Sequence, residues 1–372
     1  MNLHISIKVE IPYKTNNLNI NKIMFNTILI NKNFLINNIK QVRANNPNSF
    51  VCAMVKANAY GVGIKQVVSA IDNFVDYYGV ACFFEAKILK DITEKQILIV
   101  GALEDKIDLR FIYSCSSLAE IKALKEKNLA IKIHLKVNSG MNRYGFKDLK
   151  EFEKAIKLIK NSKLVLDGIF THFATADYYT DEQMKNFNKF VNLSHKYGFN
   201  PIIHADNSLV NQTNNHNLDM VRVGYSLYLE NKNGFNPVVE IKSKIEQINH
   251  ISKGELVGYN YKYVAKSSMK VAIVPVGYAD GFSTRLIGFN LKVKNRNCKI
   301  LNVCMDCFML DISGIKMKKG DEIYILDKFN SLCRYAKYLS ISDYEVSTNF
   351  SNIRADRKLI LSSHSKHKQN EP

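Results

Sequence analysis

The sequence predicts an α/β plus β protein, in which an N-terminal (β/α)8 TIM-like barrel is followed by a C-terminal, mostly β domain. Two observations support this prediction. Apolar, strand-like runs alternate with segments of helical periodicity between residues 50 and 227. After residue 248 the long helical patterns give way to short strand-like runs separated by turns. A chain of 372 residues is long enough for two domains with large cores.

Eight strand-like segments alternate with helix-like ones, as in a parallel barrel of the usual ~250 residues. The strand-like segments are 50–55, 78–82, 96–102, 109–114, 130–137, 165–173, 201–205 and 220–227. The helix-like segments are 64–74, 117–128, 148–159 and 181–197. One link fits poorly, because residues 102–109 are too few for a full crossover helix. Either this unit is abbreviated or one of its two strands is wrongly assigned.

The expected strands beyond residue 248 are short and closely spaced. They are 270–276, 298–303, 308–312 and 322–326, and segment 332–339 has a helical pattern. We therefore expect the barrel at 21–247 and the mostly β domain at 248–360. Residues 1–20 precede the barrel and could add a strand, and 361–372 form a polar tail.

The composition is that of an ordinary soluble protein, with 46% apolar and 23% charged residues. The net charge of +18 would suit nucleic acid, but the basic residues are interspersed with acidic ones, so we expect no such partner. No stretch reaches the ~20 apolar residues of a membrane span. The first ten residues do not read as a signal peptide. Seven scattered cysteines favour reduced thiols and a cytoplasmic location.

Lys56 is the first candidate for chemistry. It follows the apolar run 50–55 and opens a loop that contains Tyr60, Gly61 and Gly63. An amine at the end of a buried strand has a lowered pKa and can form a Schiff base with an aldehyde. A hydroxyl beside glycines, which let the backbone approach a ligand, would suit the anchoring of pyridoxal phosphate. Taken alone, a lysine at a strand end is more often an ordinary surface residue.

Other reactive side chains follow the remaining barrel strands. In a barrel of this type the active site lies at the C-terminal ends of the strands. These ends carry Lys136, Arg143, His172, His204, Ser208, Arg222 and Tyr225. Each alone has an ordinary explanation, such as a hydrogen-bonded core histidine or an ion-paired arginine. Together they form a ring around one mouth of the barrel, which favours a site.

Distinctive motifs occupy the stretches 55–61, 139–146, 171–177, 207–208, 220–224, 277–282, 304–306 and 344–346. In these motifs the chain resembles the alanine racemase family of fold-type III pyridoxal-phosphate enzymes. The motifs occur in family order from about residue 25 to about residue 357. One such motif is weak evidence, whereas the ordered set is highly specific.

The resemblance implies a role for each residue of the ring. Lys56 would hold pyridoxal 5′-phosphate as a Schiff base. The other residues implied in cofactor binding are Tyr60, His172, Ser208, Arg222, Gly224, Tyr225 and Tyr344. Arg222 would face the pyridine nitrogen, and because arginine stays protonated, that nitrogen would stay unprotonated. The ring would then withdraw electrons less strongly, which discourages side reactions such as transamination.

Racemisation needs one base on each face of Cα, because a single base would restore the starting isomer. In the family these bases are the Schiff-base lysine and a tyrosine from the partner subunit, which implies Lys56 and Tyr259 here. The substrate carboxylate would meet Arg143 and the backbone N–H of Met305. The resemblance therefore implies a homodimer with shared active sites. Lys136 matches a position that can be carbamylated in relatives.

The chain departs from the family pattern at four places. Val62 replaces a usual histidine, Asn138 stands where aspartate is common, and Cys307 stands where glutamine is common. Leu229-Glu230 replaces a usual glycine. None of these changes removes a residue assigned to the chemistry.

The expected function is the pyridoxal-phosphate-dependent racemisation of L-alanine to D-alanine for cell-wall peptidoglycan. One alternative is a racemase of serine, lysine or several amino acids. Another is a non-catalytic cofactor-binding barrel protein, against which Tyr259, Met305 and the second domain argue. Cys304 and Cys307 form a Cys-x-x-Cys pair, but no second such pair is present, so we expect no metal.

Overall fold

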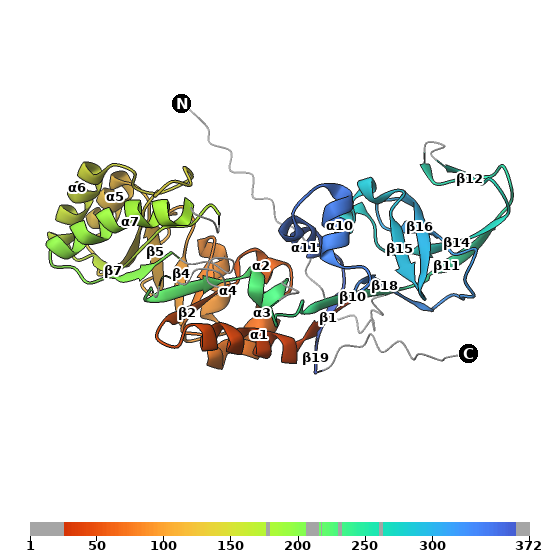
Figure 1. Cartoon of the computed structure of the whole chain (residues 1–372), viewed down its shortest axis with the longest axis horizontal. Helices are drawn as coiled ribbons and strands as arrows, with labels where there is room; N and C mark the ends of the chain where they lie inside the picture. Colours follow the sequence, from red (N-terminus) through yellow and green to blue (C-terminus); the bar gives the residue numbers. More distant parts are fainter. Residues whose placement is uncertain are drawn as a thin grey trace, which may run out of the picture.

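Eight parallel strands close into a barrel in chain order in the computed structural model (Figure 1). The structure describes residues 26–175, 179–205, 216, 218–229, 233–259 and 263–361. The barrel strands are β2 (Phe50–Met54), β3 (Tyr77–Val80), β4 (Gln96–Ile99), β5 (Phe111–Cys115), β6 (Lys132–Lys136), β7 (Val165–Phe170), β8 (Ile202–His204) and β9 (Met220–Val223). Each overlaps one of the eight predicted segments, so the predicted barrel is confirmed.

Helix α1 (Lys32–Asn45) precedes the first barrel strand, and further helices follow several of the barrel strands. They are α3 (Ile64–Ile71), α4 (Phe83–Lys90), α5 (Leu118–Glu126), α6 (Leu149–Lys160) and α7 (Tyr179–Lys196). The start of α5 is fixed by a capping box between Ser117 and Glu120. Helix α6 buries Phe152, Ile156 and Ile159 on one stripe, so truncating Ile156 to alanine would cost about 2–5 kcal/mol. In the described part of the chain, no helix is both long and apolar enough to cross a membrane.

The structure decides one open prediction in the barrel and corrects two others. No helix forms between β4 and β5, so this unit is abbreviated and both strand assignments hold. The predicted helix 64–74 ends at Ile71, and a 3-10 turn (Asp72–Phe74) follows. The predicted strand 220–227 is wrong beyond Val223, since Gly224 leaves the extended conformation (φ −139°, ψ −63°) and a short helix α9 (Tyr225–Tyr228) begins.

The second domain contains two sheets. The first has the strand order β18 (Glu322–Leu326), β10 (Val239–Lys244), β1 (Thr27–Asn31) and β19 (Asp356–Ile360). The second has the order β11 (Gln247–Ile251), β14 (Met269–Val274), β17 (Phe308–Asp311), β16 (Arg296–Val303) and β15 (Asn290–Val293). A hairpin of β12 (Leu256–Val257) and β13 (Tyr263–Val264) lies at the end remote from the barrel (Figure 1).

Strands β1 and β10 precede residue 248 but pair with strands of the C-terminal region. The chain therefore enters the second domain's sheet before it forms the barrel and returns to it afterwards. The predicted limits at 21–247 and 248–360 stay predictions. Residues 1–25 and 362–372 lie outside the described part, which leaves the expected N-terminal strand and most of the tail as predictions.

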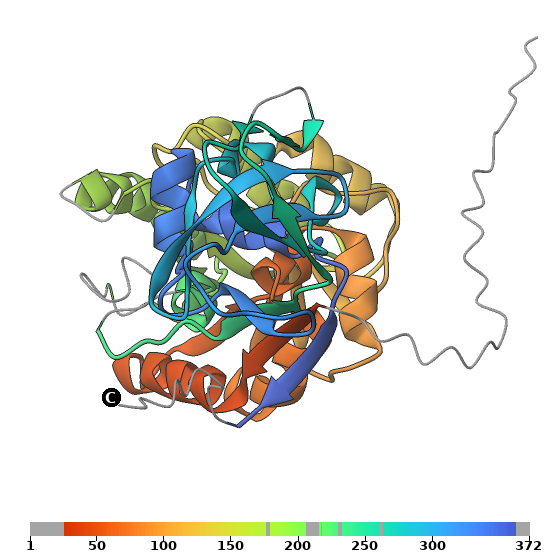
Figure 2. The same cartoon turned by 90° about the vertical axis from the view of Figure 1, so that its right-hand side faces the viewer.

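Helix α10 (Leu332–Leu339) was expected, whereas the next helix, α11 (Asp343–Phe350), was not. Helix α11 packs on the short segment α2 (Lys56–Tyr60) that follows the first barrel strand. The Ser347 hydroxyl donates to the carbonyl of Tyr60 at 2.7 Å. Seen from its own side, the second domain lies in front of the barrel (Figure 2). This contact brings one helix of the second domain to the barrel mouth.

Candidate active site

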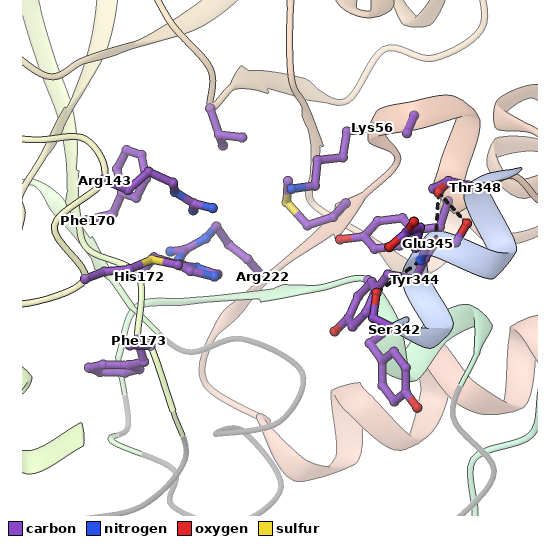
Figure 3. A pocket seen from close by; sticks show the side chains of 18 of the residues that line it. Lys56, Arg143, Phe170, His172, Phe173, Arg222, Ser342, Tyr344, Glu345 and Thr348 are labelled. Atoms are coloured by element: carbon purple, nitrogen blue, oxygen red, sulfur yellow. Dashed lines mark hydrogen bonds between the residues drawn. The ribbon is translucent and has the colours of Figure 1, made fainter. Parts of the chain in front are cut away.

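A cavity of about 710 Å³ lies at the C-terminal ends of the barrel strands, where α11 faces the barrel mouth. The predicted site residues that line it are Lys56, Tyr60, Arg143, His172, Arg222, Gly224, Tyr225 and Tyr344. In Figure 3, Arg143, His172 and Arg222 reach in from one side, while Lys56 and Tyr344 lie across from them. The structure thus gathers residues that are up to 288 positions apart in the chain (56 to 344).

Lys56 begins a left-handed turn. Ala57, Asn58, Ala59 and Tyr60 have φ values of 51°, 53°, 54° and 57°. Left-handed backbone costs a non-glycine residue roughly 1–2 kcal/mol, so four in succession are a strained arrangement. The carboxylate of Glu85 supports the turn by accepting hydrogen bonds from the N–H of Ala57 (2.6 Å) and of Ala81 (2.8 Å). The strain ends at Gly61, which adopts its φ of 91° without steric cost because it has no Cβ atom.

The amine of Lys56 is largely removed from water. Burial lowers its pKa, and the positive charges of Arg143 and Arg222 lower it further, against an opposing effect of Glu85. More of the amine is therefore unprotonated near neutral pH than for an exposed lysine. An unprotonated amine is the form that attacks an aldehyde or accepts a proton. The sequence-based expectation for this pKa and the structure agree.

Aromatic side chains and a glycine form the side of the cavity next to α11. The ring of Tyr344 lies 5.8 Å from that of Tyr60 and 5.0 Å from that of Tyr225, measured between centroids. A Cβ atom on Gly224 would lie 2.5 Å from the hydroxyl oxygen of Tyr60, so only glycine leaves this hydroxyl in place. Burial raises the pKa of Tyr60 well above its usual value, which keeps its hydroxyl a hydrogen-bond donor.

Arg222 is buried at the end of β9 and held by several acceptors. Its guanidinium donates to the carbonyls of Thr171 (2.8 Å) and Ala205 (3.2 Å) and to Nδ1 of His204 (2.6 Å). The centroid of the Phe170 ring lies 5.2 Å from the guanidinium carbon. Because a guanidinium cannot be deprotonated in a protein, this side chain is a permanent donor to whatever it faces.

Burial and neighbouring positive charges lower the pKa values of the two other basic side chains, His172 and Lys136. Burial and the cations Arg222, Arg143, Lys56 and Lys136 lower the pKa of His172 to about 3, so this imidazole is neutral. Burial and the cations Arg143, Arg222 and Lys56 lower the pKa of Lys136 to about 8. Lys136 therefore carries a fraction of unprotonated amine at pH 8.

The described lining of the cavity carries four cationic side chains, Lys56, Lys136, Arg143 and Arg222, against a single carboxylate, that of Glu345. Such a field favours an anionic ligand. An amine of lowered pKa, tyrosine hydroxyls and a space kept open at a glycine together suit a cofactor with an aldehyde and a phosphate. The residues present therefore fit pyridoxal phosphate.

Two predicted residues do not lie in this cavity. Tyr259, in the β12–β13 hairpin, is 70% exposed, and Met305, between β16 and β17, is 54% exposed. Both belong to the second domain, whose β12 end is remote from the barrel (Figure 1). Ser208, the remaining predicted cofactor residue, lies outside the described residues.

Several lining residues were missed from the sequence. Val100 follows β4, and Phe170 is the last residue of β7. The rule that barrel sites lie at the carboxyl ends of strands could therefore have indicated both. Glu345 and Thr348 lie on α11, which was not predicted. Glu345 stands in the matching stretch 344–346 and could have been indicated by it, whereas nothing in the sequence marks Thr348. The sequence also gives no sign that Glu85 supports the turn after Lys56, because its carboxylate binds two backbone N–H groups whose positions only the fold reveals.

Comparison with known proteins bears on the family. Residues 30–232 match the family model "Alanine racemase, N-terminal domain", and residues 238–359 match "Alanine racemase, C-terminal domain". The chain belongs to the alanine racemase family. It is accordingly an amino-acid racemase, an isomerase, and the resemblance inferred from the ordered motifs is confirmed.

Individual relatives agree with this assignment. The chain is 32% identical to the alanine racemase of Thermodesulfovibrio yellowstonii over 354 residues, which cover 89% of this chain and 97% of the relative. An alanine racemase structure from Clostridium difficile superposes with a TM-score of 0.84 at 29% identity, covering 91% of this chain and 96% of that one. The Bacillus anthracis alanine racemase, solved with bound L-Ala-P, gives a TM-score of 0.85 at 25% identity, with coverages of 90% and 95%.

Proposed function

We propose that this protein interconverts L- and D-alanine with pyridoxal 5′-phosphate as its cofactor. The observation that carries the proposal is Lys56, held on a strained left-handed turn with a lowered pKa, inside a cationic cavity. When bound, the cofactor withdraws electrons from the substrate's Cα and so makes the Cα proton acidic. The protein has to hold the cofactor, orient the substrate and place a base on each face of Cα.

The cofactor-binding residues divide by chemistry. Lys56 would hold the aldehyde carbon. Tyr60 and Tyr344, with Ser208 and the backbone at Gly224 and Tyr225, would donate hydrogen bonds to the phosphate. The lining of the cavity supports this placement. Tyr60 reaches it from the barrel and Tyr344 reaches it from α11 of the second domain, so the two hydroxyls can approach one ligand.

Arg222 would donate to the pyridine nitrogen. The guanidinium keeps all its N–H protons at any working pH. It would therefore donate a hydrogen bond to the pyridine nitrogen, which would keep its lone pair and gain no proton. His172, neutral because of the cations around it, lies 3.5 Å from Arg222 through Nδ1. It would accept or donate a hydrogen bond next to the second base without carrying a charge.

The two bases would be Lys56 on one face of Cα and Tyr259 of the partner subunit on the other. Within one chain Tyr259 and Met305 are exposed and lie outside the cavity, which supports their use by a second copy. Arg143 and the partner's Met305 N–H would bind the substrate carboxylate. The protein would then be a homodimer in which each active site is completed by the other subunit.

The biological role would be the supply of D-alanine for peptidoglycan in the cytoplasm. A racemase of serine, lysine or several amino acids uses the same cavity and the same two bases, and differs only in the space beside the substrate side chain. Measuring the racemisation of a panel of L-amino acids by the purified protein, with and without added pyridoxal phosphate, separates these possibilities. Rapid conversion of alanine alone supports the proposal, whereas no conversion of any amino acid contradicts it.

A further inference from the structure

A line of buried polar side chains runs through the barrel interior behind Arg222. Nδ1 of His204 on β8 lies 2.6 Å from Arg222, and its Nε2 lies 2.8 Å from Nδ1 of His134 on β6. Nε2 of His134 lies 3.2 Å from the carboxylate of Asp167 on β7. Both histidines are fully buried. Four neighbouring strands therefore supply a continuous hydrogen-bonded line from the cavity towards the opposite end of the barrel.

The chemistry at the two ends fixes every proton in this line. Arg222 can only donate, so Nδ1 of His204 accepts and its proton lies on Nε2. That N–H donates to Nδ1 of His134, which must also be unprotonated. The proton of His134 consequently lies on Nε2 and is donated to Asp167. Both histidines are neutral and both carry the Nε2–H tautomer.

A charged histidine would break this arrangement. If His134 were protonated on both nitrogens, its Nδ1–H would face the Nε2–H of His204, and two donors would oppose each other. Burial, the largest effect, lowers the pKa of His134 although Asp167 acts in the other direction, and burial and Arg222 lower the pKa of His204. Asp167 itself stays ionised, since the hydrogen bond from His134 and the charge of Lys132 outweigh the effect of its burial on its pKa.

The backbone is shaped to hold this line. The pairing of β6 with β7 contains a register shift, in which Ile133 faces Leu166 but His134 faces Gly168, so Asp167 is the extra residue. Such bulges are rare in parallel strand pairs and re-aim a side chain where they occur. A Cβ atom on Gly168 would lie 2.5 Å from the His134 ring, so glycine leaves room for the imidazole. The ring of Phe170 stacks on His204 at 4.8 Å.

We propose that Asp167 is a positioning residue for the racemase reaction: through His134 and His204 it fixes the lone pair that holds the Arg222 guanidinium in place. This proposal rests on the proposed role of Arg222 beside the cofactor ring. An ionised carboxylate accepts only, whereas an amide at the same place could also donate to His134. A donated bond would reverse both tautomers and set an N–H of His204 against the guanidinium.

The first test measures the tautomers directly. Protein labelled with ¹⁵N-histidine, with cofactor bound, is compared as wild type, Asp167→Asn and Lys132→Met by NMR at pH 7. We expect neutral, Nε2-protonated His134 and His204 in the wild type and in Lys132→Met, and a second tautomer in Asp167→Asn. Lys132, 3.6 Å from Asp167 and half exposed, is the matched control. Lys132→Met removes a charge beside Asp167 but keeps the hydrogen bond from His134, the larger of the effects that lower the pKa of Asp167, so the carboxylate stays an acceptor at pH 7. A His204 protonated on Nδ1 in the wild type would overturn the proposal.

The second test measures the reaction. In Asp167→Asn, kcat should fall about 10-fold, the scale of one hydrogen bond to a charged group, with an unchanged KM for alanine and a shifted absorbance of the bound cofactor. Gly168→Ala, which displaces the His134 ring, should give the same signature, and Lys132→Met should not. Unchanged kcat in folded Asp167→Asn overturns the proposal. An inactive wild type would instead refute the proposed function. The NMR measurement of the His134 and His204 tautomers would then still test whether Asp167 fixes the hydrogen bonds of the line.

Discussion

The two sets of side chains in the proposed active site are held in opposite ways. In the barrel, Lys56 and Arg222 are surrounded by their own chain, with strained backbone and several hydrogen bonds fixing them. In the second domain, Tyr259 and Met305 are exposed at the surface. A side chain that must act in a dry cavity but lies in water within its own chain needs another chain to cover it. If Tyr259 and Met305 serve the proposed active site, this comparison predicts that a second subunit binds where they are exposed.

The support beneath Met305 differs from the support beneath Lys56. Gly277 packs so closely on this turn that a Cβ there would lie 2.2 Å from the carbonyl oxygen of Met305. The carboxylate of Asp280 accepts from the N–H of Gly277 (3.0 Å) and from Arg354 (2.7 Å), which also reaches Asp306 at 3.2 Å. The turn is thus held by the hydrogen bonds and ion pair of buried Asp280 with partly exposed Arg354, rather than by strained backbone.

The largest effect is expected for Lys56→Ala. Removing one base and the attachment point of the cofactor should lower kcat by about 10⁴-fold or more. The yellow colour of the bound cofactor should be lost as well. Racemisation rates and visible absorbance check both. Lys65→Ala, an exposed lysine on the neighbouring helix, should change neither. A coloured, active Lys56→Ala protein would contradict the assignment of Lys56 as the residue that holds the cofactor and acts as a base.

Tyr259→Phe comes next and addresses the exposed half. Loss of one positioned base should reduce the rate about 10²- to 10⁴-fold. The loss of Cα proton exchange in deuterated water should be larger for one enantiomer of alanine than for the other. Tyr263→Phe, in the same hairpin, is the control. Equal loss for both enantiomers would contradict a base that serves a single face of Cα.

Gly224→Ala should have a smaller effect, confined to cofactor binding. The new methyl group overlaps the hydroxyl of Tyr60, and such overpacking costs about 1–3 kcal/mol. We expect at least a tenfold weaker affinity for pyridoxal phosphate, which is about 1.4 kcal/mol, with an unaltered fold. Titration of the cofactor-free protein measures this affinity. Gly314→Ala, where the nearest atom would be 3.6 Å away, should bind normally.

The smallest effect concerns the turn that carries Met305. The hydrogen bonds from Arg354 and from the N–H of Gly277 lower the pKa of Asp280 despite its burial. This stabilisation is complete above the unfolded value of about 3.9 and is lost as the pH falls through the lower folded value. Asp280→Asn should therefore reduce the free energy of unfolding by about 1–3 kcal/mol at pH 7, and by less below pH 4.

Unfolding by urea at several pH values measures this difference. Exposed Asp105 provides the control, because Asp105→Asn should leave the free energy of unfolding unchanged. A deficit in Asp280→Asn that stayed constant down to pH 3 would show that the charge of Asp280 is not what stabilises the turn.

The barrel strands were easier to predict from the sequence than several of the helices. The eight barrel strands are runs of apolar residues, which a sequence displays directly. Helices α1 and α11, which were not predicted, each bury a polar residue among apolar ones. Asn38 donates to the carbonyls of Leu227 and Asn236, and Ser347 donates to that of Tyr60. These bonds join distant parts of the chain, so the role of the two polar residues could not be inferred before the fold was known.

The site was predictable to a similar extent. The motifs indicated which residues matter, and the barrel rule indicated that Lys56, His172 and Arg222 share one mouth. The left-handed turn at Ala57–Tyr60 could not be predicted, because of these four residues only Asn58 adopts positive φ readily, and four such residues in succession are imposed by the surrounding contacts. The line from Arg222 to Asp167 also depends on a strand bulge that the sequence does not mark.

Mixing two inactive variants tests the shared site most directly. Lys56→Ala and Tyr259→Phe subunits are combined, dissociated and allowed to reassociate, and alanine racemisation is measured. Half of the dimers are then mixed, and each mixed dimer contains one site with both bases intact. The account predicts recovery of about a quarter of the wild-type activity. Activity no higher than that of the two separate variants would contradict an active site built from two chains.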